Sequence, residues 1–149
     1  RDYEGKSLKL ICILKGSIFF TCELAKRITL PVKIDFIQTS SYGSGTVSSG
    51  NIAIKKDLDE SIEGEHVLVI EDIIDSGNTL SKLMPMLEAR KPADIAVCTL
   101  LDKPDRREVD VNVKYNGFEI PDEFVVGYGL DYDQQYRNLS FIGSLEFEE

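Results

Sequence analysis

An acidic stretch near the middle of the chain carries residue types that handle phosphate and metal ions. The apolar run 67–70 is followed by Glu71 and Asp72, and residues 75–79 then read Asp-Ser-Gly-Asn-Thr before a helical pattern. Free amides at the start of a helix bind phosphate, and neighbouring hydroxyls add hydrogen bonds to its oxygens. Two carboxylates about 4 Å apart repel by roughly 4 kcal/mol near a protein surface, so the acidic pair favours a sugar diol or a divalent cation. Together these residues predict a site for a phosphorylated sugar with Mg²⁺.

Two other interpretations fit the same residues. In the first, Asp72 and Asp75 cap the following helix and Glu71 faces solvent, since aspartate is a common helix-capping residue. A receiver domain of two-component signalling also places acids after such an apolar run and binds Mg²⁺, although the Ser-Gly-Asn-Thr turn does not suit it. The spacing alone leaves the capping alternative open.

Alternating strands and helices are predicted to position this stretch. Short apolar or alternating runs predict strands, and apolar residues at three-to-four spacing predict helices. Pro85 predicts a kink or a late start for the second helix. The pattern predicts an α/β fold with a doubly wound, mainly parallel sheet, a ligand site beyond the carboxyl ends of its strands, and a small irregular hood formed by the last third of the chain. The predicted strands cover residues 8–14, 32–39, 51–56, 67–70 and 94–101, and the predicted helices cover 17–28 and a segment after residue 79.

Composition limits the classes of partner. The chain has 149 residues, with 17 basic and 26 acidic side chains and a net charge of −9. These values predict a single domain, 1–149, that binds neither nucleic acid nor a membrane. Cys12, Cys22 and Cys98 form no metal-binding spacing, so we expect buried free thiols and a cytoplasmic protein. His66, the only histidine, is expected to begin a strand.

Residues 67–79, VLVIEDIIDSGNT, resemble the phosphoribosyl-pyrophosphate signature of the type I phosphoribosyltransferases. Four further motifs stand in the order found in the hypoxanthine-guanine members of that family, and the resemblance covers essentially the whole chain. It implies transfer of the phosphoribosyl group from phosphoribosyl pyrophosphate to hypoxanthine and/or guanine, giving IMP or GMP and pyrophosphate, with Mg²⁺ as cofactor. The four motifs are Leu-Lys-Gly at 14–16, Ser-Tyr-Gly at 41–43, Leu-Asp-Lys-Pro at 101–104 and FVVGYGLD at 124–131.

For the acidic stretch, the resemblance implies a division of roles. Glu71 and Asp72 hold the ribose hydroxyls, directly or through Mg²⁺ and water. Asp75 is also the proton-transfer residue, because in the family this carboxylate lies near N7 of the purine and assists removal of its proton. The cradle of the 5′-phosphate is formed by Asp75, Ser76, Gly77, Asn78 and Thr79.

The leaving pyrophosphate is implied to meet three other parts of the chain. Lys15 and Gly16 resemble the pyrophosphate loop, in which a peptide bond is often cis. Ser41 and Tyr42 fall in a Ser/Gly-rich stretch that in the family closes over phosphoribosyl pyrophosphate and excludes water. Arg137 resembles the cation that pairs with the pyrophosphate.

The purine is implied to contact the last third of the chain. Lys103 resembles the donor to the 6-oxo group, Phe124 the ring that stacks on the base, and Val125 the backbone contact to its Watson–Crick edge. Asp131 resembles a ligand of a second Mg²⁺, and backbone groups around Val125 and Asp131 are expected to read the 2-position of the base. From the residues alone, Phe124 and Val125 equally fit a strand core, and Asp133 is an alternative to Asp131.

The resemblance also concerns assembly and completeness. Family members form dimers and tetramers, so a homodimer or homotetramer is expected. They carry an additional N-terminal helix in the hood, and we expect this chain to lack it. A regulator that keeps the fold but binds RNA or senses nucleotides is an alternative, against which the scattered, outnumbered basic residues argue.

Overall fold

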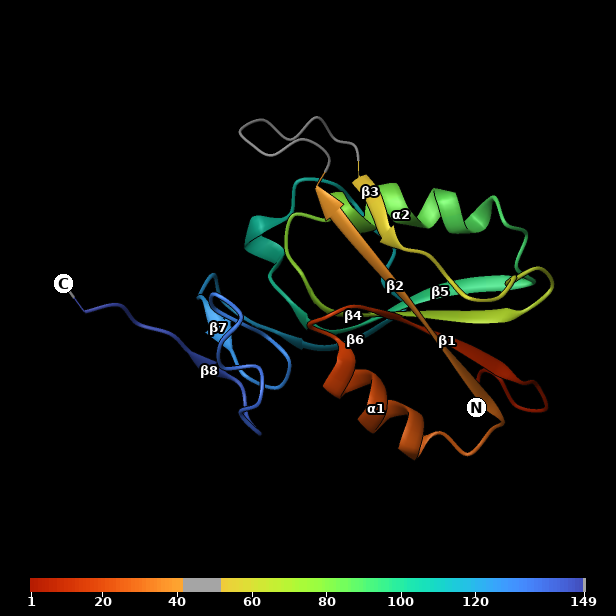
Figure 1. Ribbon diagram of the computed structural model, residues 1–149, viewed down its shortest axis with the longest axis horizontal. Helices are drawn as coiled ribbons and strands as arrows, with labels where there is room; N and C mark the ends of the chain where they lie inside the picture. Colours follow the sequence, from red (N-terminus) through yellow and green to blue (C-terminus); the bar gives the residue numbers. More distant parts are fainter. Residues whose placement is uncertain (42–51, 149) are drawn as a thin grey trace.

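Strands and helices alternate along most of the chain (Figure 1). The computed structural model describes residues 1–41 and 52–148. Its elements are β1 (Leu8–Ile13), α1 (Ile18–Arg27), β2 (Val32–Ser41), β3 (Ile52–Lys56), β4 (His66–Ile74), α2 (Asn78–Glu88), β5 (Asp94–Asp102), the 3₁₀ turn η1 (Pro104–Arg106), β6 (Tyr115–Glu119), β7 (Val125–Val126) and β8 (Gly143–Ser144).

Parallel pairing dominates the main sheet. Its strand order is β3-β2-β1-β4-β5-β6. Strand β1 pairs in parallel with β2 and β4, β4 with β5, and β5 with β6. Within the described residues, β3 alone joins this sheet antiparallel, against β2. The predicted α/β fold with a mainly parallel sheet is therefore confirmed.

The two helices cover opposite faces of the sheet. Successive residues of a strand point to opposite sides, so neighbouring residues of β1 show which helix packs on which face. Ile11 and Ile13 of β1 lie in the apolar cluster that contains Leu83 of α2. Leu10 lies in a second cluster, with Leu24 of α1 packed against it. In Figure 1, α1 lies below the sheet and α2 above it. Both faces of β1 and β4 are thus buried, as continuous apolar runs predict.

A small hood stands at one end of the sheet. Strands β7 and β8 pair antiparallel as a separate two-stranded sheet. Figure 1 shows them beside the start of α1, at the end of the molecule where β1 gives way to that helix. The carboxyl ends of parallel strands form the usual ligand site of such sheets, so the hood lies where it can cover bound molecules.

Charged side chains anchor the connection between β3 and β4. Lys9 of β1 is 1% exposed, and its Nζ lies 3.1 Å from Oε2 of Glu60. The buried carboxylate of Asp35 in β2 accepts hydrogen bonds from the amides of Asp59 and Glu60, at 3.0 and 3.2 Å. These polar groups have partners, as buried polar groups require.

Several local expectations differ from the structure. Strand β4 runs to Ile74 and not to residue 70, so the acidic pair lies inside the strand. Helix α2 begins at Asn78 and contains Pro85, so the expected late start is wrong. Cys22 is exposed on α1, whereas Cys12 and Cys98 are buried as expected. Tyr42 and the rest of 42–51 lie outside the described residues.

His66 begins β4, as expected, and Nδ1 of its ring lies 2.5 Å from Oδ2 of Asp94 at the start of β5.

Among the described residues, neither helix combines the length and the apolar character that crossing a bilayer requires.

Candidate active site

The turn between β4 and α2 holds five of the predicted residues. Asp75 follows the last residue of β4, and α2 begins three residues later at Asn78. Oδ1 of Asp75 accepts a hydrogen bond from the amide of Ser76 at 2.6 Å, and Oγ of Ser76 accepts one from the amide of Asn78 at 3.2 Å. Gly77 has φ +84°, a left-handed conformation that other residues rarely adopt. The N-cap residue of α2 is Gly77, and the Asp75 carboxylate bonds to the amide of Ser76 before the helix begins, so the helix-capping interpretation of Asp75 is wrong.

A cavity of about 60 Å³ opens on this turn. Ile73 lines this cavity and was not predicted from the sequence. Its position between the acidic pair and Asp75 is the signal that could have identified it. An apolar side chain here offers a dry wall beside polar groups, a common feature of ligand sites. The cavity is lined by Glu71, Ile73, Ile74, Asp75, Ser76, Gly77, Thr79 and Leu80.

The acidic pair projects from the second half of β4. Oε1 of Glu71 accepts a hydrogen bond from the amide of Asp72 at 3.1 Å, and Oδ1 of Asp72 accepts one from the amide of Ile73 at 2.7 Å. Burial raises the pKa of Glu71 well above its usual range, and the adjacent charge of Asp72 adds to the rise. Two carboxylates held in this way favour the approach of a cation or of hydroxyl donors.

The loop after β1 lies against Asp72. The peptide bond between Leu14 and Lys15 is cis, as the resemblance implies for a pyrophosphate loop. A Cβ added at Gly16 would lie 1.8 Å from Oδ2 of Asp72, so any larger residue would require this carboxylate to move from its observed position. The structure therefore brings the predicted pyrophosphate loop and the predicted ribose-binding acid into direct contact.

The hood reaches the same loop. A Cβ added at Gly129 would lie 2.2 Å from the carbonyl oxygen of Gly16, so the two backbones meet closely. Nζ of Lys15 lies 3.2 Å from Oε1 of Gln134, and a guanidinium nitrogen of Arg137 lies 3.1 Å from the same oxygen. Gln134 was not predicted; its φ of +64° reflects a tight turn whose conformation the sequence pattern does not reveal.

Asp131 and Arg137 lie together in this turn. A guanidinium nitrogen of Arg137 is 3.4 Å from Oδ1 of Asp131, and the other terminal nitrogen donates to the carbonyl of Gly129 at 2.7 Å. Oδ2 of Asp131 accepts from the amide of Gln134 at 2.9 Å. Asp133 is exposed. This geometry favours Asp131 over Asp133 as the acid associated with Arg137.

The residues predicted to contact a purine lie around the end of β5 and the start of β7. The amide of Lys103, directly after β5, donates to the carbonyl of Ile74 at 2.9 Å, which ties this residue to the end of β4. Phe124 is 48% exposed, and its ring meets those of Tyr132 and Phe147 edge-on, at centroid distances of 5.8 and 6.4 Å. An aromatic ring held in this way and still exposed is available for stacking on a base.

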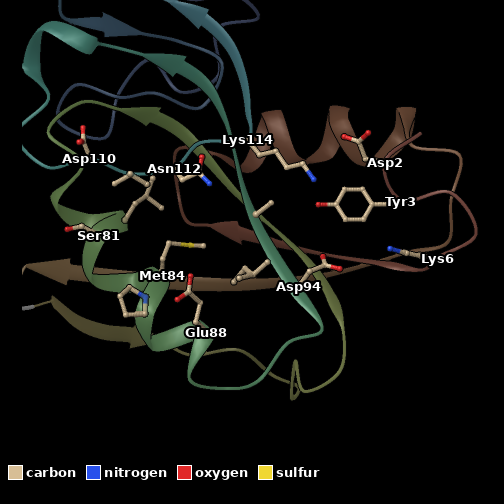
Figure 2. A pocket seen from close by; sticks show the side chains of 15 residues that line it. Asp2, Tyr3, Lys6, Ser81, Met84, Glu88, Asp94, Asp110, Asn112 and Lys114 are labelled. Atoms are coloured by element: carbon tan, nitrogen blue, oxygen red, sulfur yellow. The ribbon is translucent and has the colours of Figure 1, made fainter.

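Volume alone would point to a different place. A cavity of about 530 Å³ lies along α2, with Ser81, Met84 and Glu88 on one side (Figure 2). Figure 2 shows Lys114 directed toward Tyr3 on the other side. None of the residues predicted for the site lines this cavity. The chemistry of the lining residues, and not the size of the hollow, identifies the candidate site.

The acidic residues fit Mg²⁺ in a particular way. In the part of the chain that the structure describes, no group of three or more His, Cys, Asp or Glu side chains is placed to hold a metal ion. Mg²⁺ usually binds one or two carboxylates and takes its remaining oxygens from water and substrate phosphates. The pair Glu71 and Asp72 suits that mode, because its mutual repulsion is relieved by a cation.

The sequence model of the phosphoribosyl transferase domain matches residues 1–133. The chain belongs to this family. A hypoxanthine phosphoribosyltransferase of Haemophilus influenzae is 53% identical over 149 residues, which are 100% of this chain and 83% of that protein. A hypoxanthine-guanine phosphoribosyltransferase of Mycobacterium avium is 54% identical over 142 residues, or 95% of this chain and 70% of that protein.

Solved structures agree with this assignment. A hypoxanthine phosphoribosyltransferase of Staphylococcus aureus superposes with a TM-score of 0.93 at 52% identity, covering 97% of this chain and 79% of that one. The Trypanosoma cruzi enzyme, solved with its product IMP, has a TM-score of 0.90 at 42% identity, covering 97% and 82%. Within the family, the chain falls among the hypoxanthine(-guanine) phosphoribosyltransferases, transferases of purine salvage that form IMP or GMP. The receiver-domain alternative is therefore excluded.

Proposed function

We propose that the residues around the β4–α2 turn carry out Mg²⁺-dependent transfer of a phosphoribosyl group to hypoxanthine and/or guanine. The observation that carries the assignment is the contact between the acidic strand end and the loop after β1, at Asp72 and Gly16. This contact places a carboxylate suited to a ribose diol directly beside a loop suited to pyrophosphate, two groups that phosphoribosyl pyrophosphate carries on one molecule.

The 5′-phosphate binds to the turn formed by Asp75, Ser76, Gly77, Asn78 and Thr79. Amides at the start of α2 have no acceptors within the helix, and the helix dipole favours an anion there. The left-handed Gly77 lets the backbone approach the phosphate closely. Glu71, which lines the cavity at this turn, and the adjacent Asp72 bind the ribose hydroxyls.

The pyrophosphate binds between the loop after β1 and the hood. Lys15, Gly16 and Arg137 converge there, linked through Gln134. Arg137 presents a planar fork of donors that matches phosphate oxygens. Ser41, at the end of β2, and Tyr42 are proposed to complete this side when substrate is bound.

The purine lies against Phe124, with the ammonium group of Lys103 donating to its 6-oxo group. Backbone groups at Val125 accept or donate along the Watson–Crick edge, and those near Asp131 meet the 2-position. Hypoxanthine and guanine share the 6-oxo group and differ at the 2-position, so one set of contacts serves both bases. Ile73 supplies an apolar surface in the neighbouring cavity.

Glu71 and Asp72 would hold one Mg²⁺ and Asp131 a second, and the metal would neutralise negative charge on the leaving pyrophosphate. The bond between the anomeric carbon and pyrophosphate breaks as N9 of the purine bonds to that carbon. The carboxylate of Asp75 takes the proton that N7 loses, as a general base. The cradle residues keep the sugar in place during this displacement.

Family membership also supports proposals about the whole molecule. We propose that residues 1–149 form one domain, that the enzyme assembles as a homodimer or homotetramer, and that it works in the cytoplasm. Size-exclusion chromatography with light scattering tests the assembly state.

The decisive experiment measures pyrophosphate release from phosphoribosyl pyrophosphate and Mg²⁺ with hypoxanthine, guanine and xanthine in turn. Wild-type protein is expected to release pyrophosphate with hypoxanthine or guanine. The folded Asp75→Asn variant is expected to lose about 100-fold or more in kcat, within the range of one general base. No release by folded wild-type protein with any base would refute the proposal and favour a regulator that binds RNA or nucleotides.

A further inference from the structure

Arg107, which follows η1, bridges the ends of β4 and β5. Its Nε donates to the carbonyl oxygen of Asp75 at 2.9 Å, and a terminal nitrogen forms an ion pair with the carboxylate of Asp102. The two side chains of this pair are 20% and 14% exposed. A largely buried guanidinium with two acceptors of fixed position has little freedom to move.

The carbonyl that Arg107 holds belongs to the peptide that also orients the Asp75 carboxylate. That peptide joins Asp75 to Ser76, and its N–H donates to Oδ1 of Asp75 at 2.6 Å. The plane of one peptide is therefore held on its carbonyl side by Arg107 and on its N–H side by the carboxylate. Hydrogen bonds in series polarise one another, so the donor at the carbonyl strengthens the bond at the N–H.

Backbone groups of the two residues after Arg107 also hold the neighbouring phosphate turn. The carbonyl of Ser76 accepts from the amides of Glu108 and Val109, at 2.9 and 3.0 Å. A Cβ added at Gly77 would lie 2.5 Å from the carbonyl oxygen of Val109, so this segment packs directly on the turn. The phosphate turn therefore has backbone support besides Arg107, whose Cδ would also lie 3.3 Å from a Cβ added at Gly77, while the hydrogen bond from Nε of Arg107 acts on the Asp75–Ser76 peptide at the start of the turn.

Asp102 is in turn held from the other side. Its Oδ2 accepts from Nδ2 of Asn116 at 3.2 Å, and Asp102 directly precedes Lys103 in the chain. Arg107 thus links the strand end that presents Lys103 to the peptide that presents Asp75.

We propose that Arg107 is a positioning residue for proton transfer: paired with Asp102, it fixes the Asp75–Ser76 peptide and so the direction of the Asp75 carboxylate. The inference rests on the proposed role of Asp75 and goes beyond it. It predicts that loss of the two-armed contact slows the chemical step while leaving substrate binding nearly unchanged.

The test uses Arg107→Lys, because one ammonium group cannot replace a fork that reaches two acceptors. The matched control is Arg106→Lys, the neighbouring arginine, which is 55% exposed and lies 3.5 Å from Asp122. We expect Arg107→Lys to lower kcat and the single-turnover rate of IMP formation at least tenfold. KM for hypoxanthine and for phosphoribosyl pyrophosphate should stay within threefold, and Arg106→Lys should match wild type within twofold.

A double-mutant cycle separates positioning from general support. If Arg107 acts through Asp75, adding Arg107→Lys to Asp75→Asn lowers kcat by less than twofold further, since residues that act as a unit are not additive. Asp102→Asn, which weakens the same pair with little change of shape, should lower kcat at least threefold. It carries the test if Arg107→Lys does not fold.

Three results would overturn the inference. They are a kcat of Arg107→Lys within twofold of wild type, full additivity with Asp75→Asn, or a loss of kcat that appears only with raised KM values and a melting temperature lowered in proportion. Inactive wild-type protein would instead refute the proposed function, so the two failures are distinguishable.

Discussion

The contact between Gly16 and Asp72 can be tested by replacing Gly16 with alanine. The added Cβ would start 1.8 Å from Oδ2 of Asp72, and real Cβ contacts are not found below 3.0 Å, so the carboxylate must shift by about 1.2 Å. Gly16 does not have a left-handed φ, so alanine adds no backbone strain of that kind. The substitution therefore moves one site carboxylate and little else.

The size of the effect follows from that shift. A misplacement of about 1 Å at a reacting centre costs about 100-fold in rate, so kcat/KM for phosphoribosyl pyrophosphate should fall about 100-fold. Moving the carboxylate also breaks the 2.7 Å hydrogen bond from the amide of Ile73 to Oδ1 of Asp72. That loss is worth about 1 kcal/mol, which lowers the melting temperature of a chain of this size by about 2–4 °C.

The assay is IMP formation under varied phosphoribosyl pyrophosphate, with thermal melting of the same preparations. Gly143→Ala in β8 is the matched control, because the nearest atom to its added Cβ is a side-chain carbon of Phe141 at an ordinary 3.5 Å. If Gly16→Ala keeps more than a third of the wild-type kcat/KM, the Asp72 carboxylate can move without loss of activity, and the reasoning is refuted. A fall in melting temperature above about 10 °C would show that the clash reaches the backbone instead.

Three further predictions concern binding, metal and stability. Lys103→Met should raise KM for hypoxanthine at least tenfold and leave KM for phosphoribosyl pyrophosphate within twofold in steady-state assays; equal changes in both would contradict its role at the base. Excess EDTA should abolish pyrophosphate release, and added Mg²⁺ should restore it; activity that survives chelation would rule out the metal. The two-armed contact with Arg90 lowers the pKa of Asp57. The stabilisation that this ion pair gives the folded protein is present above the unfolded-state pKa of Asp57 and is lost as the pH falls below about 4. In melting curves between pH 6 and about pH 3, Asp57→Asn should therefore lose less stability than wild type. An unchanged acid slope would count against that pair.

The strand and helix pattern could be predicted because it depends on local residue types. The nearly continuous apolar residues of β1 and of the first half of β4 reflect burial on both faces, and the sequence pattern reports such burial directly. The acidic turn could be recognised because the functional residues 71–79 are contiguous. The residues assigned to the purine and to the pyrophosphate could be identified only from the resemblance, since Lys103 or Arg137 taken alone in the sequence is typical of a surface residue.

What could not be predicted depends on contacts between distant segments. β4 continues through Glu71 and Asp72 because its end pairs with β5, at Ile73 with Leu101 and Ile74 with Asp102. Backbone pairing tolerates acidic side chains within a strand, whereas a prediction based on apolar runs ends the strand where they begin. The left-handed turn at Gln134 brings a neutral side chain between two cations, a contact that no local pattern signals.

The contact between Lys15 and Gln134 has a consequence for biosynthesis. The two residues are 119 positions apart in the sequence. A ribosome that adds about 5–20 residues per second needs about 6–24 s to pass from one to the other. During that time the loop after β1, β4 and the phosphate turn can already exist, while the hood does not. A nascent chain halted before the hood is synthesised should therefore hold an incomplete pyrophosphate site, and catalytic competence should appear only after the hood has been translated.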